Sequence, residues 1–208
     1  MSIRKQVTLA AETAIRGGSI ALYVNGSEVE SIVGDGSISR AEQLLPEIDR
    51  LLRSHDLKPA DIDLFAVSTG PGSFTGIRVG IATALGLKAA ISARFVGISS
   101  LEAIALSSDS KIVAVAVPMG RNVVCFQQFL DHVASGPPAL LDPNEFSAFA
   151  ASYEGVLVVE GSLRDAVRET RYPVVDVGYN IASLIATAAQ NGHAGDDLTP
   201  LFVDRKKT

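Results

Sequence analysis

A glycine-rich turn is the segment with the greatest potential to bind a ligand. It reads Ser68-Thr69-Gly70-Pro71-Gly72-Ser73-Phe74-Thr75-Gly76 and lies between a short apolar run and a helix-compatible stretch. The free N–H groups of such a helix could hold an anion such as a phosphate. However, no Lys-Ser or Lys-Thr follows, and the glycine spacing fits neither the P-loop nor the dinucleotide-binding pattern. We therefore interpret the segment as a structural turn, in which Ser73 caps the following helix.

Residues that perform catalysis are scarce in the rest of the chain. His55, His132 and His193 are far apart and form no H-x-x-x-H pair, so no zinc-hydrolase or iron ligands are visible. There is no G-x-S-x-G motif for a nucleophilic serine. The only cysteine, Cys125, lies in an apolar run, which favours a buried and inert thiol over a nucleophile.

Acidic residues raise two further possibilities for a metal site. Glu12 follows the first predicted strand, where one carboxylate could hold a hydrated Mg²⁺, but a capping or turn role is favoured. Asp61 and Asp63 flank the start of another strand, and we expect them to be solvated rather than to form a metal dyad. The sequence thus predicts no catalytic, cofactor-binding or metal-binding residue in this chain.

The composition is that of a folded globular protein. Of the 208 residues, 47% are apolar and 20% charged, with a formal net charge of −5. The only basic run is 205–207, so an RNA-binding surface of its own is poorly supported. The apolar run near the N-terminus is broken too early by Glu12 for a signal peptide, and no run approaches the roughly 20 residues of a membrane span. We expect a cytoplasmic protein.

The predicted elements have the same order in both halves of the chain. The first half gives strands at 7–11, 19–24, 28–33, 61–67 and 94–97, and helices at 40–54, 75–91 and 100–106. The second half gives strands at 111–117, 123–130, 139–141, 155–160 and 173–177, and helices at 144–152, 163–170 and 181–190. Both halves read βββαβαβα. This predicts two α/β lobes, 1–106 and 107–208, and favours a ribonuclease-H-like pair, as in actin and Hsp70, over a generic three-layer domain.

The helix expected at 75–91 is apolar on two sides. Gly76, Gly80 and Ala84 give it a small-residue side, while Phe74, Ile77, Ile81 and Leu85 lie opposite. A helix of this kind is buried on both sides. One side can face its own sheet, and the other needs a cover from the second lobe or from another chain.

The glycine-rich turn and the residues after it resemble the sequence of a known family. Ser68 to Gly80 closely resembles the signature of TsaB, formerly YeaZ, and Val96-Gly97-Ile98-Ser99-Ser100-Leu101-Glu102-Ala103 continues it. The resemblance is strong from about residue 40 to 106. It implies an actin/Hsp70-like ATPase fold and a non-catalytic role. TsaB pairs with its paralogue TsaD, which carries the metal-binding histidines, and with the ATPase TsaE these proteins install threonylcarbamoyl on adenosine at position 37 of tRNA.

The resemblance also implies partner surfaces. TsaB proteins contact TsaD, or a second TsaB when alone, through the helices that correspond to 40–54 and 75–91, and tRNA is reached only through the complex. The expected interface residues in this sequence are Leu44, Leu45, Ile48, Ser73, Phe74, Thr75, Gly76, Val79, Gly80, Thr83, Ala84 and Leu87. Gly80→Arg or Val79→Glu is then expected to fold but lose the partner. The alternative is a stand-alone actin-like kinase or ATPase.

Overall fold

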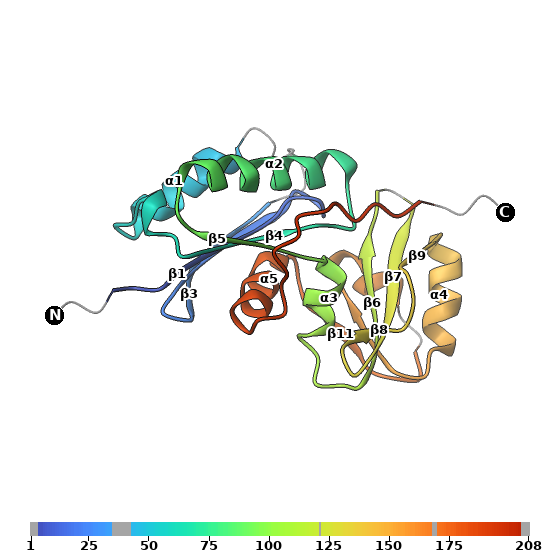
Figure 1. Cartoon of the computed structure of the whole chain (residues 1–208). Coiled ribbons are helices and arrows are strands. Elements are labelled where there is room, and N and C mark those ends of the chain that lie inside the picture. The colour runs from blue at the N-terminus through green and yellow to red at the C-terminus, as the bar shows by residue number, and fades with distance from the viewer. Residues whose placement is uncertain (1–3, 35–42, 121, 168–169, 205–208) are drawn as a thin grey trace.

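The chain folds around two mixed β-sheets. The computed structural model describes residues 4–34, 43–120, 122–167 and 170–204. We call the first sheet the N-terminal sheet; it has five strands in the order β3-β2-β1-β4-β5 (Figure 1). Its strands are β1 (Val7–Glu12), β2 (Ser19–Val24), β3 (Ser27–Val33), β4 (Leu64–Ser68) and β5 (Arg94–Ile98). The first three strands are antiparallel and the last two run parallel to β1, as expected for hairpins that continue into βαβ crossovers.

The second sheet, here the C-terminal sheet, has the order β11-β10-β6-β7-β8, with β9 also paired to β7. Its strands are β6 (Ile112–Pro118), β7 (Val124–Leu130), β8 (Val133–Ala134), β9 (Ala139–Leu141), β10 (Val156–Val159) and β11 (Val174–Asp176). The weakly predicted strand at 139–141 is therefore present, and β8 is an additional short strand that the sequence did not predict.

The helices follow the predicted order with two differences. They are α1 (Leu44–Ser54), η1 (Pro59–Asp61), α2 (Phe74–Ala90), α3 (Ser100–Ala105), α4 (Pro143–Ser152), η2 (Gly161–Ala166) and α5 (Ile181–Gln190). Residues 40–42 of the first predicted helix lie outside the described residues. The helix predicted at 163–170 was wrong in type, because the chain forms the short 3₁₀ helix η2 there. Within the described residues, no helix has the length and apolar character needed to cross a membrane.

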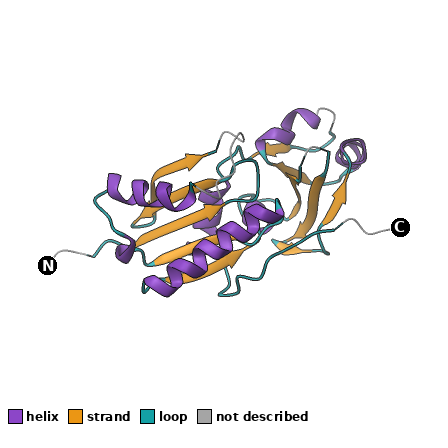
Figure 2. Cartoon of the chain, turned by 90° about the horizontal axis from the view of Figure 1, so that it is seen from above, coloured by secondary structure: helices purple, strands orange, loops and turns teal. Residues whose placement is uncertain are grey.

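Alternating side chains place the two sheets between layers of helices. On β1, Leu9 packs with α1 on one face, whereas Ala10 packs with α3 and α5 on the other. On β6, Val115 faces the same central layer and Ala116 faces α4 and η2. Figures 1 and 2 show the resulting stack, with α1 and α2 covering the outer face of the N-terminal sheet and α4 lying outside the C-terminal sheet.

The last helix, α5, belongs to the central layer and contacts β1, β2 and β4 of the N-terminal sheet. The sheet meets it with the small side chains of Ala10, Ala21 and Ala66, which lets the helix approach closely. Downstream of α5, Gly195 and Gly97 exchange backbone hydrogen bonds, and the Leu201 N–H donates to Thr69. The predicted boundary between residues 106 and 107 falls between α3 and β6, and we retain it as a proposal for where the lobes divide. The C-terminal end of the chain nevertheless packs against the N-terminal sheet.

Candidate docking face on helix α2

The first turn of α2 rests on the turn that follows β1. The Ser73 N–H donates to the Ala14 carbonyl at 2.8 Å, and the Thr13 hydroxyl donates to the Gly76 carbonyl at 2.7 Å. A Cβ atom on Gly76 would overlap the Thr13 carbonyl oxygen, and one on Gly80 would press on the Thr13 side chain. Glycine is therefore required at both positions so that the helix can approach this turn.

These contacts overturn the sequence-based choice of docking side. We expected the small-residue side of the helix to meet a partner, but Gly76, Gly80 and Ala84 are buried against this chain's own first turn and sheet. Leu44 and Ile48 of α1 are likewise buried, at 1% and 3% exposure. These five residues of the predicted interface face the interior of the chain and are not available to a partner.

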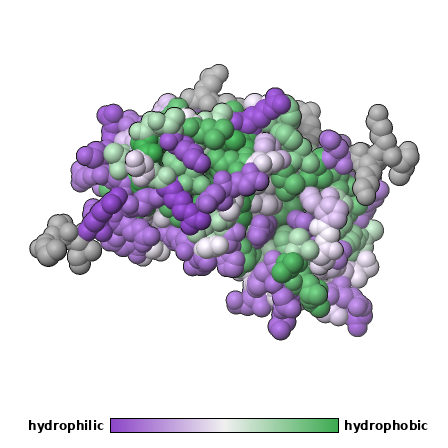
Figure 3. Space-filling view, in the orientation of Figure 1, coloured by the Kyte–Doolittle hydropathy of each residue, from purple (hydrophilic) through white to green (hydrophobic). Residues whose placement is uncertain are grey.

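The exposed residues of α2 are mostly apolar or small, and Arg78 and Lys88 are the two charged ones. Phe74 and Leu85 are 53% and 52% exposed, and Ala82 and Ala89 are exposed between and beyond them. The helix spacing places these four residues on one side, and Figure 3 shows apolar side chains gathered over α2. The residues that form this docking face are Phe74, Thr75, Arg78, Ala82, Leu85, Gly86 and Ala89.

Two contacts fix the N-terminal end of the docking face. The Phe74 ring stacks on Phe202 with ring centroids 5.0 Å apart, and the Arg78 guanidinium carbon lies 3.7 Å from the Phe74 ring centroid. Phe202 comes from the C-terminal segment, which is coloured red in Figure 1. The ring contact therefore joins the C-terminal segment to the first turn of α2 at the rim of this face.

The other predicted interface residues fall into two groups, one exposed to solvent and one half-buried. Ser73, Phe74 and Thr75 are exposed at the start of α2, and Leu45 is 52% exposed on α1. The half-buried residues are Val79, Thr83 and Leu87. Sequence reasoning missed Arg78, Ala82, Gly86, Ala89 and Phe202, and it assigned Leu85 to the opposite side. No local signal distinguishes the two sides, because both consist of apolar and small residues.

Several backbone donors of the glycine-rich turn are used within the chain. The Thr69 N–H donates to Ile98, the Gly70 N–H to the Ser68 hydroxyl and the Gly76 N–H to the Ser73 hydroxyl. Gly70 has a φ of 109°, a conformation that favours glycine. Ser73 caps α2, as predicted. The arrangement matches the structural interpretation of the turn better than a phosphate cradle.

Glu12 also has a structural contact. It is the last residue of β1 rather than the residue after it, and its carboxylate accepts the N–H groups of Ala14 and Ile15 at 2.6 and 3.0 Å. Asp63 is half-buried, and it accepts the Val7 N–H and the Arg4 guanidinium. Both carboxylates thus shape the backbone at the ends of β1.

The remaining titratable candidates are dispersed. Cys125 is buried, as predicted, and desolvation raises the pKa of its thiol to about 12. His55 pairs with Glu30 at 3.0 Å on the surface of the N-terminal lobe. Across the part of the chain that the structure describes, no three His, Cys, Asp or Glu side chains gather into a group able to hold a metal ion.

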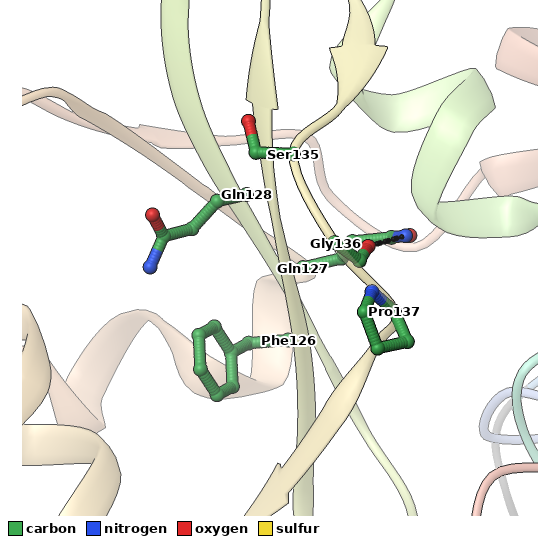
Figure 4. A pocket seen from close by; sticks show the side chains of 6 residues that line it. All are labelled: Phe126, Gln127, Gln128, Ser135, Gly136 and Pro137. Atoms are coloured by element: carbon green, nitrogen blue, oxygen red, sulfur yellow. Dashed lines mark hydrogen bonds between the residues drawn. The ribbon is translucent and has the colours of Figure 1, made fainter.

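A shallow hollow of about 200 Å³ lies beside β7, next to the loop between β8 and β9. Figure 4 shows Phe126 and Gln128 on one side of β7, while the Gln127 amide donates to the Gly136 carbonyl at 2.8 Å. Ser135 and Pro137 complete its wall. The hollow is lined by one aromatic ring, two amides and the Ser135 hydroxyl, with no acid or base to activate that hydroxyl.

Comparison with known proteins finds similarity to TsaD and TsaB sequences. A family model described as TsaD, tRNA N6-adenosine threonylcarbamoyltransferase, matches residues 37–134. The tRNA threonylcarbamoyladenosine biosynthesis protein TsaB of Haemophilus influenzae is 32% identical over 124 residues, which cover 58% of this chain and 52% of that protein. These similarities support the TsaB (YeaZ) family. It spans about half the length of the curated relatives that it matches.

Solved structures confirm the two-lobed α/β fold. YeaZ from Pseudomonas aeruginosa superposes with a TM-score of 0.68 at 20% identity, covering 95% of this chain and 100% of that one. The activator of the 2-hydroxyisocaproyl-CoA dehydratase from Clostridium difficile, a structure with bound ADPNP, gives a TM-score of 0.55 at 10% identity, with 90% and 96% covered. The two-lobed α/β fold and the similarity to TsaB agree with the sequence-based interpretation.

Proposed function

We propose that this chain is an accessory subunit for threonylcarbamoyl modification of tRNA at position 37, and that it binds a TsaD-like transferase through the docking face of α2. It supplies no catalytic group of its own, and the partner carries the chemistry. Sequence similarity to TsaB supports the pathway, and the exposed apolar face of α2 supports the mode of binding. In the same proposal, TsaE joins as a third protein, tRNA is contacted only through the complex, no cofactor is required, and the chain works in the cytoplasm.

The exposed apolar face of α2 is the observation that carries the proposal. A helix on the surface of a globular protein normally turns charged residues to solvent, but the nine exposed residues of α2 include only two charged ones, Arg78 and Lys88. Contiguous apolar surface of this kind is typical of protein interaction sites. The same face supports a homodimer of the isolated chain, because two copies could cover each other's helices.

The binding experiment compares two variants that introduce the same charge at different exposed sites. Leu85→Glu changes the docking face, and Val133→Glu changes a side chain that is 70% exposed on β8 of the C-terminal sheet. Both residues are on the surface, so both variants should fold. Binding to the TsaD-like chain of the same organism is measured by gel filtration and calorimetry, with far-UV circular dichroism as a check of folding.

We expect Leu85→Glu to weaken binding at least about ten-fold, since a buried charge without a partner is costly at the centre of an interface. Val133→Glu should bind as the unchanged chain does. If Leu85→Glu, Val133→Glu and the unchanged chain bind with equal affinity, the assignment of the docking face is refuted. If the unchanged chain does not bind, the assignment of the partner is refuted. The variant Gly80→Arg suggested by the sequence is unsuitable, because Gly80 packs on Thr13 and Val67 inside the chain.

A second candidate function is a stand-alone actin-like kinase or ATPase. The fold likeness to the dehydratase activator, whose structure contains ADPNP, is the observation in its favour. Calorimetry of the purified chain with Mg-ATP separates the two functions. Micromolar binding together with ATP turnover by the isolated chain would support the enzyme and contradict the accessory role.

A further inference from the structure

Among the seven residues that form the docking face of α2, Arg78 alone carries a charge. It lies one helical turn after Phe74 and one turn before Ala82, so the three side chains form a continuous row along the helix. A partner that covers both Phe74 and Ala82 must therefore cover Arg78 as well. The chemistry of this one side chain limits which partners the face can accept.

The guanidinium of Arg78 is held in place by an aromatic ring. Its central carbon lies 3.7 Å from the centroid of the Phe74 ring. That ring also contacts Phe202, with the two centroids 5.0 Å apart. Phe202 follows Leu201, whose N–H donates to the Thr69 carbonyl at 2.7 Å and ties the C-terminal segment to the glycine-rich turn. The cation is thus positioned before any partner binds.

The N–H groups of Arg78 are not used in an ion pair with a described residue. Arg53 and Arg94, by contrast, each bond to an aspartate of this chain. The N–H groups of a guanidinium lie in its own plane, so contact with a ring leaves them able to donate two parallel hydrogen bonds to a carboxylate. Arg78 therefore offers a binding group for an acidic side chain of another molecule.

Covering Arg78 would change the surroundings of its charge. In the chain by itself Arg78 is exposed, so water solvates the guanidinium. A partner lying on the face would remove this water, and burying a charge without a counter-charge is costly. A carboxylate opposite Arg78 would offset that cost with charge-assisted hydrogen bonds. The face thus favours a partner that presents one acidic group among apolar side chains.

A second copy of this chain does not bring such a group on its own α2. The nine exposed residues of this helix include no aspartate or glutamate; they are Phe74, Thr75, Arg78, Ala82, Leu85, Gly86, Lys88, Ala89 and Ala90. Two copies packed α2 against α2 would cover both Arg78 charges without a carboxylate from either helix. A surface that leaves charges unpaired against one partner discriminates against that partner.

We propose that the docking face of α2 receives a protein whose apolar surface carries one carboxylate placed to bind Arg78, and that this ion pair makes a different protein, rather than a second copy, the preferred occupant. The inference rests on the proposed accessory role and adds the chemistry of the partner's surface. Arg78 is the specificity-determining residue of the face, while Phe74, Ala82 and Leu85 supply apolar contact.

The test neutralises each exposed cation of α2 in turn. Arg78→Met removes the charge but keeps an unbranched side chain that can still contact the Phe74 ring. Lys88→Met removes the same charge from the same helix outside the docking face, and it serves as the matched control. Both residues are exposed, so both variants should fold, and far-UV circular dichroism checks this.

Two dissociation constants are measured for each protein, one with the TsaD-like chain of the same organism by calorimetry and one for the homodimer by sedimentation equilibrium. Arg78→Met should weaken binding to the TsaD-like chain at least about ten-fold, because the partner's carboxylate is left buried and unpaired. The same variant should leave self-association unchanged or strengthen it, because two unpaired charges are removed. Lys88→Met should change neither constant by more than about two-fold.

Several outcomes would overturn the inference while the proposed function survives. Equal weakening by Arg78→Met and Lys88→Met would indicate a general attraction between charged surfaces instead of a local ion pair. An unchanged affinity of Arg78→Met for the TsaD-like chain would show that no carboxylate meets Arg78. A homodimer tighter than the complex would show that a second copy is preferred. If the unchanged chain does not bind the TsaD-like chain at all, the proposed function fails together with this inference.

Discussion

At the residue scale, the glycines of α2 have opposite surroundings. Gly76 lies against the backbone of Thr13 and Ala14, whereas a Cβ on Gly86 would meet nothing within 4 Å. The sequence offers the same residue at both positions, and only its neighbours determine whether a side chain can be tolerated. The first glycine is required by packing, and the second only adds conformational freedom to the unfolded chain.

Substitution by alanine should therefore change stability in opposite directions. Gly76→Ala should lower the free energy of unfolding by about 1–3 kcal/mol or more, because the added methyl group forces α2 away from Thr13. Gly86→Ala, the control in the same helix, should raise it by about 0.5–1 kcal/mol through helix propensity. Urea unfolding of both variants measures these values. Equal effects would contradict the close packing at Gly76.

At the element scale, the two helices outside the N-terminal sheet differ in how well their sequences predict their orientation. Helix α1 alternates apolar and charged residues, and its buried residues Leu44, Ile48, Leu51 and Leu52 form one stripe. Helix α2 has no such contrast, since its residues are apolar or small on every side. Its existence was predictable from hydropathy, but its inward side was not.

The start of helix α4 is determined by residues that are close together in the sequence. Asp142 accepts the Asn144 and Glu145 N–H groups, and the Glu145 carboxylate accepts the Asp142 N–H, which forms a capping box. Asp142→Ala should cost about 1 kcal/mol of unfolding free energy, and Asp142→Asn, which keeps an acceptor, should cost clearly less. Urea titrations measure both. A loss as large for asparagine as for alanine would argue against the cap.

At the scale of the whole molecule, the chain returns to its first lobe after completing the second. Helix α5 covers the small-residue face of the N-terminal sheet, and Gly195 pairs with Gly97 of β5. The repeated order of elements suggested two successive lobes. The structure adds that the central helical layer contacts both sheets at once.

This arrangement predicts that the two halves do not fold independently. A fragment of residues 1–106 lacks α5, so Ala10, Ala21 and Ala66 would be exposed to water. We expect this fragment alone to lack a cooperative thermal transition in circular dichroism, and mixing it with 107–208 to restore one. A cooperative transition in the isolated 1–106 fragment would show that α5 is dispensable for the first lobe.

The sequence by itself indicated the resemblance to TsaB proteins and the order of elements. These features depend on local patterns such as the signature from Ser68 to Gly80, hydropathic periodicity and turn residues such as Asn25-Gly26, both of which have positive φ. Only the tertiary structure decided which side of α2 faces solvent and that Phe202 of the C-terminal segment meets Phe74. The physical reason is that both depend on contacts between residues far apart in the chain, such as Thr13 with Gly76, which no local pattern encodes.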